Sequence, residues 1–117
     1  MDACKCKCEE GGVELLARFT TLIGESSFTT VPIDASGKDA LTVQAWRGDI
    51  QGGGTFGLFL EESLDAEHWS PFNAAAIDPG ANTVKTLEVC PTLKWVRARV
   101  ESTGDAQVTC WAEGSFG

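Results

Sequence analysis

Apolar residues recur at every second position through most of this chain, and this alternation limits the fold more than any other feature. A period of two residues places the apolar side chains on one face of an extended strand. Turn residues separate six such segments, which cover residues 28–33, 41–46, 55–62, 83–89, 93–101 and 106–113. Closely spaced strands without helices between them predict an all-β fold, an antiparallel β-sandwich or jelly roll, in one domain.

The segment before the first of these strands has a different pattern. Between Val13 and Ile23 the apolar residues fall at helical spacing, at Leu15, Leu16, Phe19, Leu22 and Ile23. This spacing favours a short helix, although Thr20 and Thr21 form helices poorly and an extended arm is the alternative. Gly24 ends the run. We therefore expect an N-terminal arm over residues 1–24 and a β-sandwich domain over residues 25–117.

Two connections between the expected strands differ in character. Gly52, Gly53 and Gly54 lie between the segments 41–46 and 55–62, which predicts a hairpin with a loose, glycine-rich turn. Residues 63–80 form a long connection rich in turn residues and alanine.

The N-terminal tail carries three cysteines in alternation with two lysines. In an extended tail, Cys4, Cys6 and Cys8 place their sulfurs on one side. Structural zinc sites use four ligands and cysteine pairs with a wider spacing. Three interpretations therefore stay open: free thiols, disulfides to another chain, or a metal site whose fourth ligand comes from Cys90, Cys110, His68 or another subunit. The chain has five cysteines in total, so they cannot all pair within one chain. Cys110 is in phase with buried positions, and we expect it in the core.

The charge balance excludes some classes of partner. Nine lysines and arginines against seventeen acidic residues give a net charge of −8. A chain this acidic repels phosphate backbones, so we expect no nucleic-acid binding. An apolar run of about 18 residues, the length that predicts a membrane span, is missing. The N-terminus lacks the apolar centre of a secretory signal, and we expect synthesis in the cytoplasm.

Tryptophan and arginine lie on the polar side of several strands. Trp95, Arg97 and Arg99 alternate with Val96 and Ala98 and point away from the core. Trp111 and Trp46 hold the same position in their own strands, and we expect Trp111 beside Trp95 on one outer face. Such a composition is typical of an interface. The expected interface residues are Trp46, Trp95, Arg97 and Trp111, with Leu15, Leu16 and Phe19 of the arm. Coverage of these rings by the chain's own arm or by residues 63–80 is the alternative.

Catalytic patterns are absent from the sequence. The single histidine, His68, lies in a loop, and neither a Gly-x-Ser-x-Gly nor a His-Glu-x-x-His pattern occurs. Glu61, Glu62 and Asp65 cluster before it, and paired carboxylates can cleave glycosidic bonds. Acidic residues are common at strand ends, however, so we expect neither an enzyme nor a cofactor.

Three ordered stretches carry a resemblance to a known family. They are Ile33 to Val43, Leu60 to Trp69 with the form L-E-x-S-x-D-x-x-x-W, and Leu93 to Val100. Over residues 28–113 the chain resembles the small β-sandwich head-decoration, or cement, proteins of tailed bacteriophages. The resemblance implies a non-enzymatic virion protein, often trimeric, that binds the major capsid protein on the outside of the shell and stabilises it.

A second resemblance supports an alternative function. The Ser-x-Asp-x-x-x-Trp turn is similar to a turn of discoidin-type and other sugar-binding sandwiches, in which glycine usually stands at the position of Ala66. A tryptophan platform can stack on sugar rings. A carbohydrate-binding module is therefore the alternative to a capsid-decoration protein.

Overall fold

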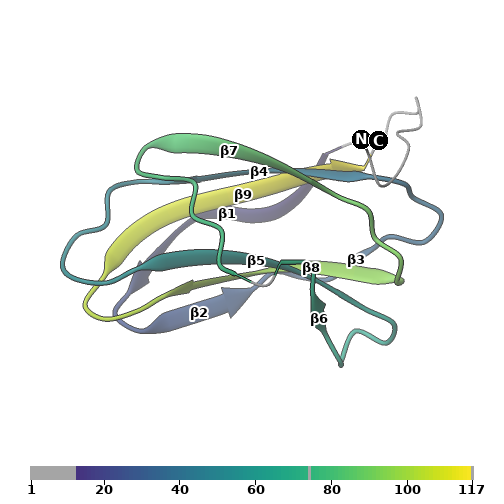
Figure 1. Cartoon of the computed structure of the whole chain (residues 1–117), viewed down its shortest axis with the longest axis horizontal. Coiled ribbons are helices and arrows are strands. Elements are labelled where there is room, and N and C mark those ends of the chain that lie inside the picture. Colours follow the sequence, from purple (N-terminus) through teal and green to yellow (C-terminus); the bar gives the residue numbers. More distant parts are fainter. Residues whose placement is uncertain (1–12, 74, 117) are drawn as a thin grey trace.

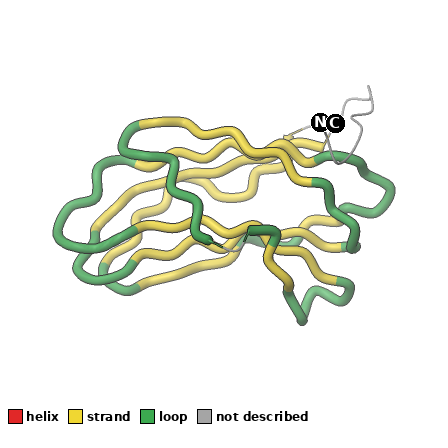
Figure 2. The backbone as a smooth tube through the Cα atoms, viewed as in Figure 1, coloured by secondary structure: helices red, strands yellow, loops and turns green. Residues whose placement is uncertain are grey.

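The computed structural model describes residues 13–73 and 75–116, which form two antiparallel sheets packed against each other (Figure 1). Sheet A has the strand order β1-β9-β4-β7, and sheet B has the order β2-β8-β5-β6, with β3 also paired to β8. Strands and loops make up the whole described part (Figure 2). The strands are β1 (Val13–Ile23), β2 (Ser26–Thr29), β3 (Ile33–Asp34), β4 (Leu41–Arg47), β5 (Phe56–Ser63), β6 (Ser70–Pro71), β7 (Thr83–Val89), β8 (Trp95–Ser102) and β9 (Gln107–Phe116).

The predicted β-sandwich is confirmed, and the alternation of the sequence explains its core. In β4, β8 and β9 every second side chain is buried, because the inner face of each sheet packs on the other sheet. β8 and β9 alternate most regularly, and both contribute to one core, although β8 lies in sheet B and β9 in sheet A. The largest fully buried side chains are Leu22, Leu41, Leu58, Leu60, Val43, Val96, Val100 and Val108.

The helix expected over residues 13–23 is wrong. This segment is strand β1, which pairs with β9 from Val13 opposite Ser115 to Ile23 opposite Gln107. The register shifts twice within the strand, and each irregularity inserts an extra residue that breaks the period of two. Apolar residues separated by these shifts imitate helical spacing. The boundary after residue 24 therefore falls at the turn into β2, and β1 is an edge strand of the sandwich itself.

The hairpin expected around the three glycines is also wrong. β4 lies in sheet A, where it pairs with β7 and β9, whereas β5 lies in sheet B beside β8. The connection instead crosses from one sheet to the other and packs on the turn between β8 and β9. Gly52 and Gly54 have φ angles of 80° and 153°, and a Cβ atom on either would collide with the backbone of that turn.

The segment 28–33, expected as a single strand, is divided by a proline. Pro32 has no backbone N–H and cannot continue the ladder, so β2 ends at Thr29 and β3 begins at Ile33. Thr30 bridges the interruption, since its N–H donates to the Ala98 carbonyl at 2.9 Å and its hydroxyl accepts the Ala98 N–H at 2.9 Å. Both short strands thereby remain paired with β8.

An ion pair secures the connection between β6 and β7 to the end of β4. Arg47 is buried, and its guanidinium donates to both carboxylate oxygens of Asp78, at 2.6 Å from Nε and at 3.1 Å from the second nitrogen. A third bond reaches the Gly48 carbonyl at 2.9 Å. The hydrogen bonds from Arg47 lower the pKa of Asp78, so the pair stays charged at neutral pH.

No helix in the described part of the chain is long and apolar enough to cross a membrane.

Candidate functional site

Four outward-facing residues of sheet A form the feature that we call the apolar row, which consists of Phe19, Trp111, Trp46 and Val84. Trp46 of β4 lies opposite Trp111 of β9 on one side and Val84 of β7 on the other. The ring of Phe19, from β1, meets the Trp46 ring edge to face, with 5.8 Å between the centroids. The row therefore runs across all four strands of sheet A.

The apolar row is unusually exposed for a set of large apolar side chains. Phe19 is 70% exposed and Val84 is 47% exposed, and both tryptophans are half-buried. Ile23, further along β1, is 68% exposed. Each Å² of apolar surface that a partner covers contributes about 25 cal/mol, and contiguous exposed apolar patches commonly mark interaction sites.

The expectation that Trp95, Arg97 and Trp111 share one face is wrong. Trp95 and Arg97 point outward from β8 in sheet B, and Trp111 points outward from β9 in sheet A, so the two tryptophans lie on opposite outer faces of the sandwich. Trp46 and Phe19, in contrast, do join Trp111. The backbone of Leu15 and Leu16 belongs to β1, and the structure does not describe their side chains.

The outer face of sheet B carries a compact set of charged and aromatic side chains, which we call the arginine ladder. Glu61 of β5 lies between two arginines of β8, and its two oxygens accept bonds from Arg97 at 2.8 Å and from Arg99 at 3.0 Å. Each guanidinium also stacks on a ring, Arg97 on Trp69 and Arg99 on Phe59, both at 4.1 Å from the centroid.

These contacts stabilise a carboxylate that is buried in its charged form. Glu61 is only 7% exposed, and an unpaired charge at that depth is strongly unfavourable. The hydrogen bond to Glu61 also raises the pKa of Arg99, and the charge of the neighbouring Glu101 adds to this. The ladder accounts for Arg97 as a structural residue of sheet B. Sequence reasoning did not predict that Glu61 would be its partner. The available signal was that Phe59 and Glu61 share one face of β5, as Arg97 and Arg99 share one face of β8.

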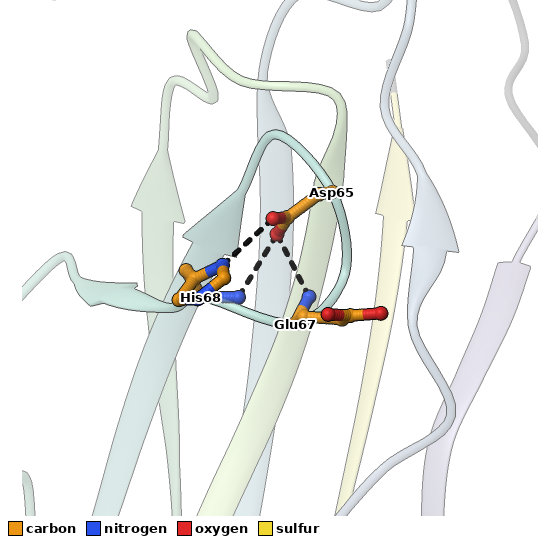
Figure 3. Close-up of side chains that lie close together, drawn as sticks. All are labelled: Asp65, Glu67 and His68. Carbon is orange, nitrogen blue, oxygen red and sulfur yellow. Dashed lines mark hydrogen bonds and ion pairs between the residues drawn. The ribbon is translucent and has the colours of Figure 1, made fainter.

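The turn after β5 is built around Asp65 (Figure 3). One Asp65 oxygen accepts the backbone N–H groups of Glu67 and His68, each at 2.9 Å, and the other lies 2.7 Å from His68 Nδ1. These bonds hold the pKa of Asp65 far below its usual value. Ala66 has a φ of 65°, in the left-handed region that favours glycine, which is the residue that similar turns carry there.

The carboxylates considered for catalysis each hold part of the backbone or a neighbouring side chain. Asp65, Glu67 and His68 bring possible metal-binding atoms within 4.8 Å of one another, but all three are exposed and Asp65 already holds the turn. Glu62 accepts the N–H groups of Thr92 at 2.9 Å and Leu93 at 3.1 Å. Glu61, Glu62 and Asp65 thus have separate structural partners rather than a common cleft.

The cysteines divide into three groups. Cys110 is a buried free thiol of the core, as predicted, and burial raises its pKa to about 11. Cys90 is half-buried and disulfide-bonded. Cys4, Cys6 and Cys8, the candidates for an inter-chain disulfide or a metal site, lie outside the described residues.

Comparisons with known proteins identify the fold. No family model and no curated protein matches the sequence. Among solved structures, PBSX exported protein XepA superposes with a TM-score of 0.67 at 18% sequence identity, over 92% of this chain and 38% of the XepA chain. This chain has the fold of one part of XepA. It spans well under half of XepA's length, and at this identity the likeness establishes the fold alone.

Proposed function

We propose that this chain is a non-enzymatic structural protein of phage particles that docks on the outer surface of the shell through the apolar row. The row itself carries the proposal. It presents two half-buried tryptophans flanked by the exposed side chains of Phe19 and Val84, which is the composition of the energetic centre of a protein interface.

Two further observations support this function over other ones. XepA, with which this chain shares its fold, is an exported protein of the phage-related element PBSX. The carboxylates near His68 serve the turn and the ladder, which leaves the apolar row as the most prominent candidate site in residues 13–73 and 75–116. A decoration protein needs such a docking face and no reaction centre.

Binding to particles tests the proposal directly. Phage particles from the host that encodes the chain are purified on a density gradient, and the chain is detected by immunoblotting and mass spectrometry. We expect it to sediment with intact particles, and we expect the double variant Trp46→Ala/Trp111→Ala to be lost from them while remaining folded. Absence of the native chain from intact particles refutes the proposal.

A carbohydrate-binding function has one observation in its favour. Hydroxyl and amide groups border the tryptophans: Thr109 precedes Trp111 by two residues in β9, and Gln44 precedes Trp46 by two in β4. Sugar ligands use such groups together with a ring face. A glycan array probed with the native chain distinguishes the two functions, because tight binding to one glycan class that the double tryptophan variant abolishes supports the module.

A further inference from the structure

The two borders of the apolar row differ in charge. On the side toward the start of β1 and the end of β9, Glu113 follows Trp111 by two residues, and Glu88 follows Val84 by four. Because alternate residues of a strand share a face, both carboxylates point outward, Glu113 next to the row and Glu88 one outward position further, beyond Thr86. The register places Glu113 opposite Gln44 and Glu88 opposite Thr42.

The opposite border holds one described carboxylate, Asp49, which accepts a hydrogen bond from Asn82 Nδ2 at 3.2 Å. There Thr21 of β1 lies opposite Thr109 of β9, and their hydroxyl oxygens are 2.8 Å apart in a hydrogen bond. Ile23 and Gln107 follow as the next outward pair. In β4, β7 and β9 the outward positions hold no lysine or arginine, whereas β1 carries the exposed Arg18 next to Phe19. The face is therefore apolar at its centre, with the two carboxylates Glu88 and Glu113 toward one border and the hydrogen-bonded Asp49 at the other.

The acidic border lacks counter-charges in the described part of the chain. Glu61 on sheet B binds two arginines, and Asp78 binds Arg47. No ion pair reaches Glu88 or Glu113 from any other described residue. Exposed carboxylates beside an interface contribute little alone, but they attract a partner of opposite charge and fix its orientation.

We propose that the partner of this face is a protein surface with an apolar centre and lysine or arginine residues along the one border that meets Glu88 and Glu113. This inference rests on the proposed docking function and adds the chemistry and orientation of the partner. The net charge of −8 favours a basic partner and disfavours a second copy of the chain, which would add the same negative charge.

The test uses particles assembled in a host from which the gene for this chain is deleted. Purified native chain and variants are added to these particles, and the bound fraction is measured by sedimentation. The measurement is made at about 0.05 M NaCl, where screening is weak, and at about 0.5 M NaCl, where it is strong. The test variant is Glu88→Lys/Glu113→Lys. The matched control, Glu67→Lys/Asp105→Lys, makes the same change in charge in the turn after β5 and in the turn before β9, which lies at the end of β9 far from Glu113.

For the native chain we expect roughly tenfold weaker binding at the higher salt concentration, because screening weakens an attraction between opposite charges. The test variant should bind roughly tenfold more weakly at low salt and should lose the salt dependence, while the control resembles the native chain. Equal losses in both variants attribute the effect to net charge and overturn the inference. If only the tryptophan substitutions weaken binding, the docking function stands and the basic partner is refuted. If the native chain does not bind at all, the proposed function itself fails.

Discussion

Replacing the buried Glu61 by glutamine should destabilise the sandwich, because its carboxylate serves two arginines at once. The carboxylate receives bonds from Arg97 and Arg99 at 2.8 and 3.0 Å. Glutamine preserves the shape but offers one acceptor oxygen, and its NH₂ group would face the second arginine, donor against donor. Two guanidinium groups would then lie side by side without a counter-charge between them.

The magnitude follows from these contacts. Hydrogen bonds to charged groups contribute roughly 1.5–3 kcal/mol each, which gives an upper limit of about 6 kcal/mol for two. The arginine side chains are 22% and 30% exposed, so water compensates part of the loss, and glutamine retains one bond. We expect a loss of about 2–3 kcal/mol, which lowers the melting temperature by roughly 10 °C for a domain of this size.

Urea unfolding monitored by tryptophan fluorescence measures this change. With an m-value of about 1.5 kcal/mol/M, the midpoint should fall by roughly 1.3–2 M. Glu67→Gln is the matched control, because the Glu67 side chain is exposed in the turn after β5, and it should change the stability by less than about 0.5 kcal/mol. A Glu61→Gln variant as stable as that control would refute the idea that the shared carboxylate holds the ladder together.

Four further predictions rest on single residues. Ala66→Gly should stabilise the protein by about 0.5–1 kcal/mol in the same urea assay, because φ is 65° at this position; a destabilised variant would contradict this. Asp65 has a lowered pKa in the folded state, so its contribution is present above its unfolded pKa of about 3.9 and lost as the pH falls through the folded value. The difference in melting temperature between native chain and Asp65→Asn should accordingly shrink in acid, and a constant difference would argue against it. Iodoacetamide at pH 8 should modify Cys110 only after unfolding, since burial raises its pKa to about 11; rapid labelling of the native protein would show an open core. Lys85 occupies an inward register position opposite Ala45 on the edge strand β7, where a charge opposes pairing with other chains, so Lys85→Val should increase light scattering on storage, and unchanged scattering would count against that role.

The regular strands could be predicted because burial acts on every second residue. Val96, Ala98 and Val100 are buried while the residues between them are not, and this contrast is visible in the sequence alone. The same logic failed in β1, where register shifts displaced Phe19 and Leu22 from a strict alternation. Local pattern carries no information on a bulge, because the partner strand that tolerates the extra residue is far away in the sequence.

Sheet membership could not be derived from local pattern either. A glycine-rich loop permits a hairpin within one sheet and a crossing between two sheets, and only the strands that flank β4 decided between them. The error propagated to the site: Trp95 and Trp111 were expected as neighbours, whereas Trp46 is the residue opposite Trp111. Val84 was not expected in the row at all, because a lone valine on an exposed strand gives no signal without its register.

The pairing of the first long strand with the last one constrains how the protein forms in the cell. β1 hydrogen-bonds only with β9 within sheet A, and β9 also separates β1 from β4. Because the ribosome adds residues from the N-terminus, β1 has no partner strand in sheet A until the ten-residue strand β9, Gln107–Phe116, has left the exit tunnel. Contacts of such long sequence separation slow folding. The complete sandwich therefore forms only after β9 has been synthesised, and a chain that terminates before β9 leaves β1 without its place in the sheet.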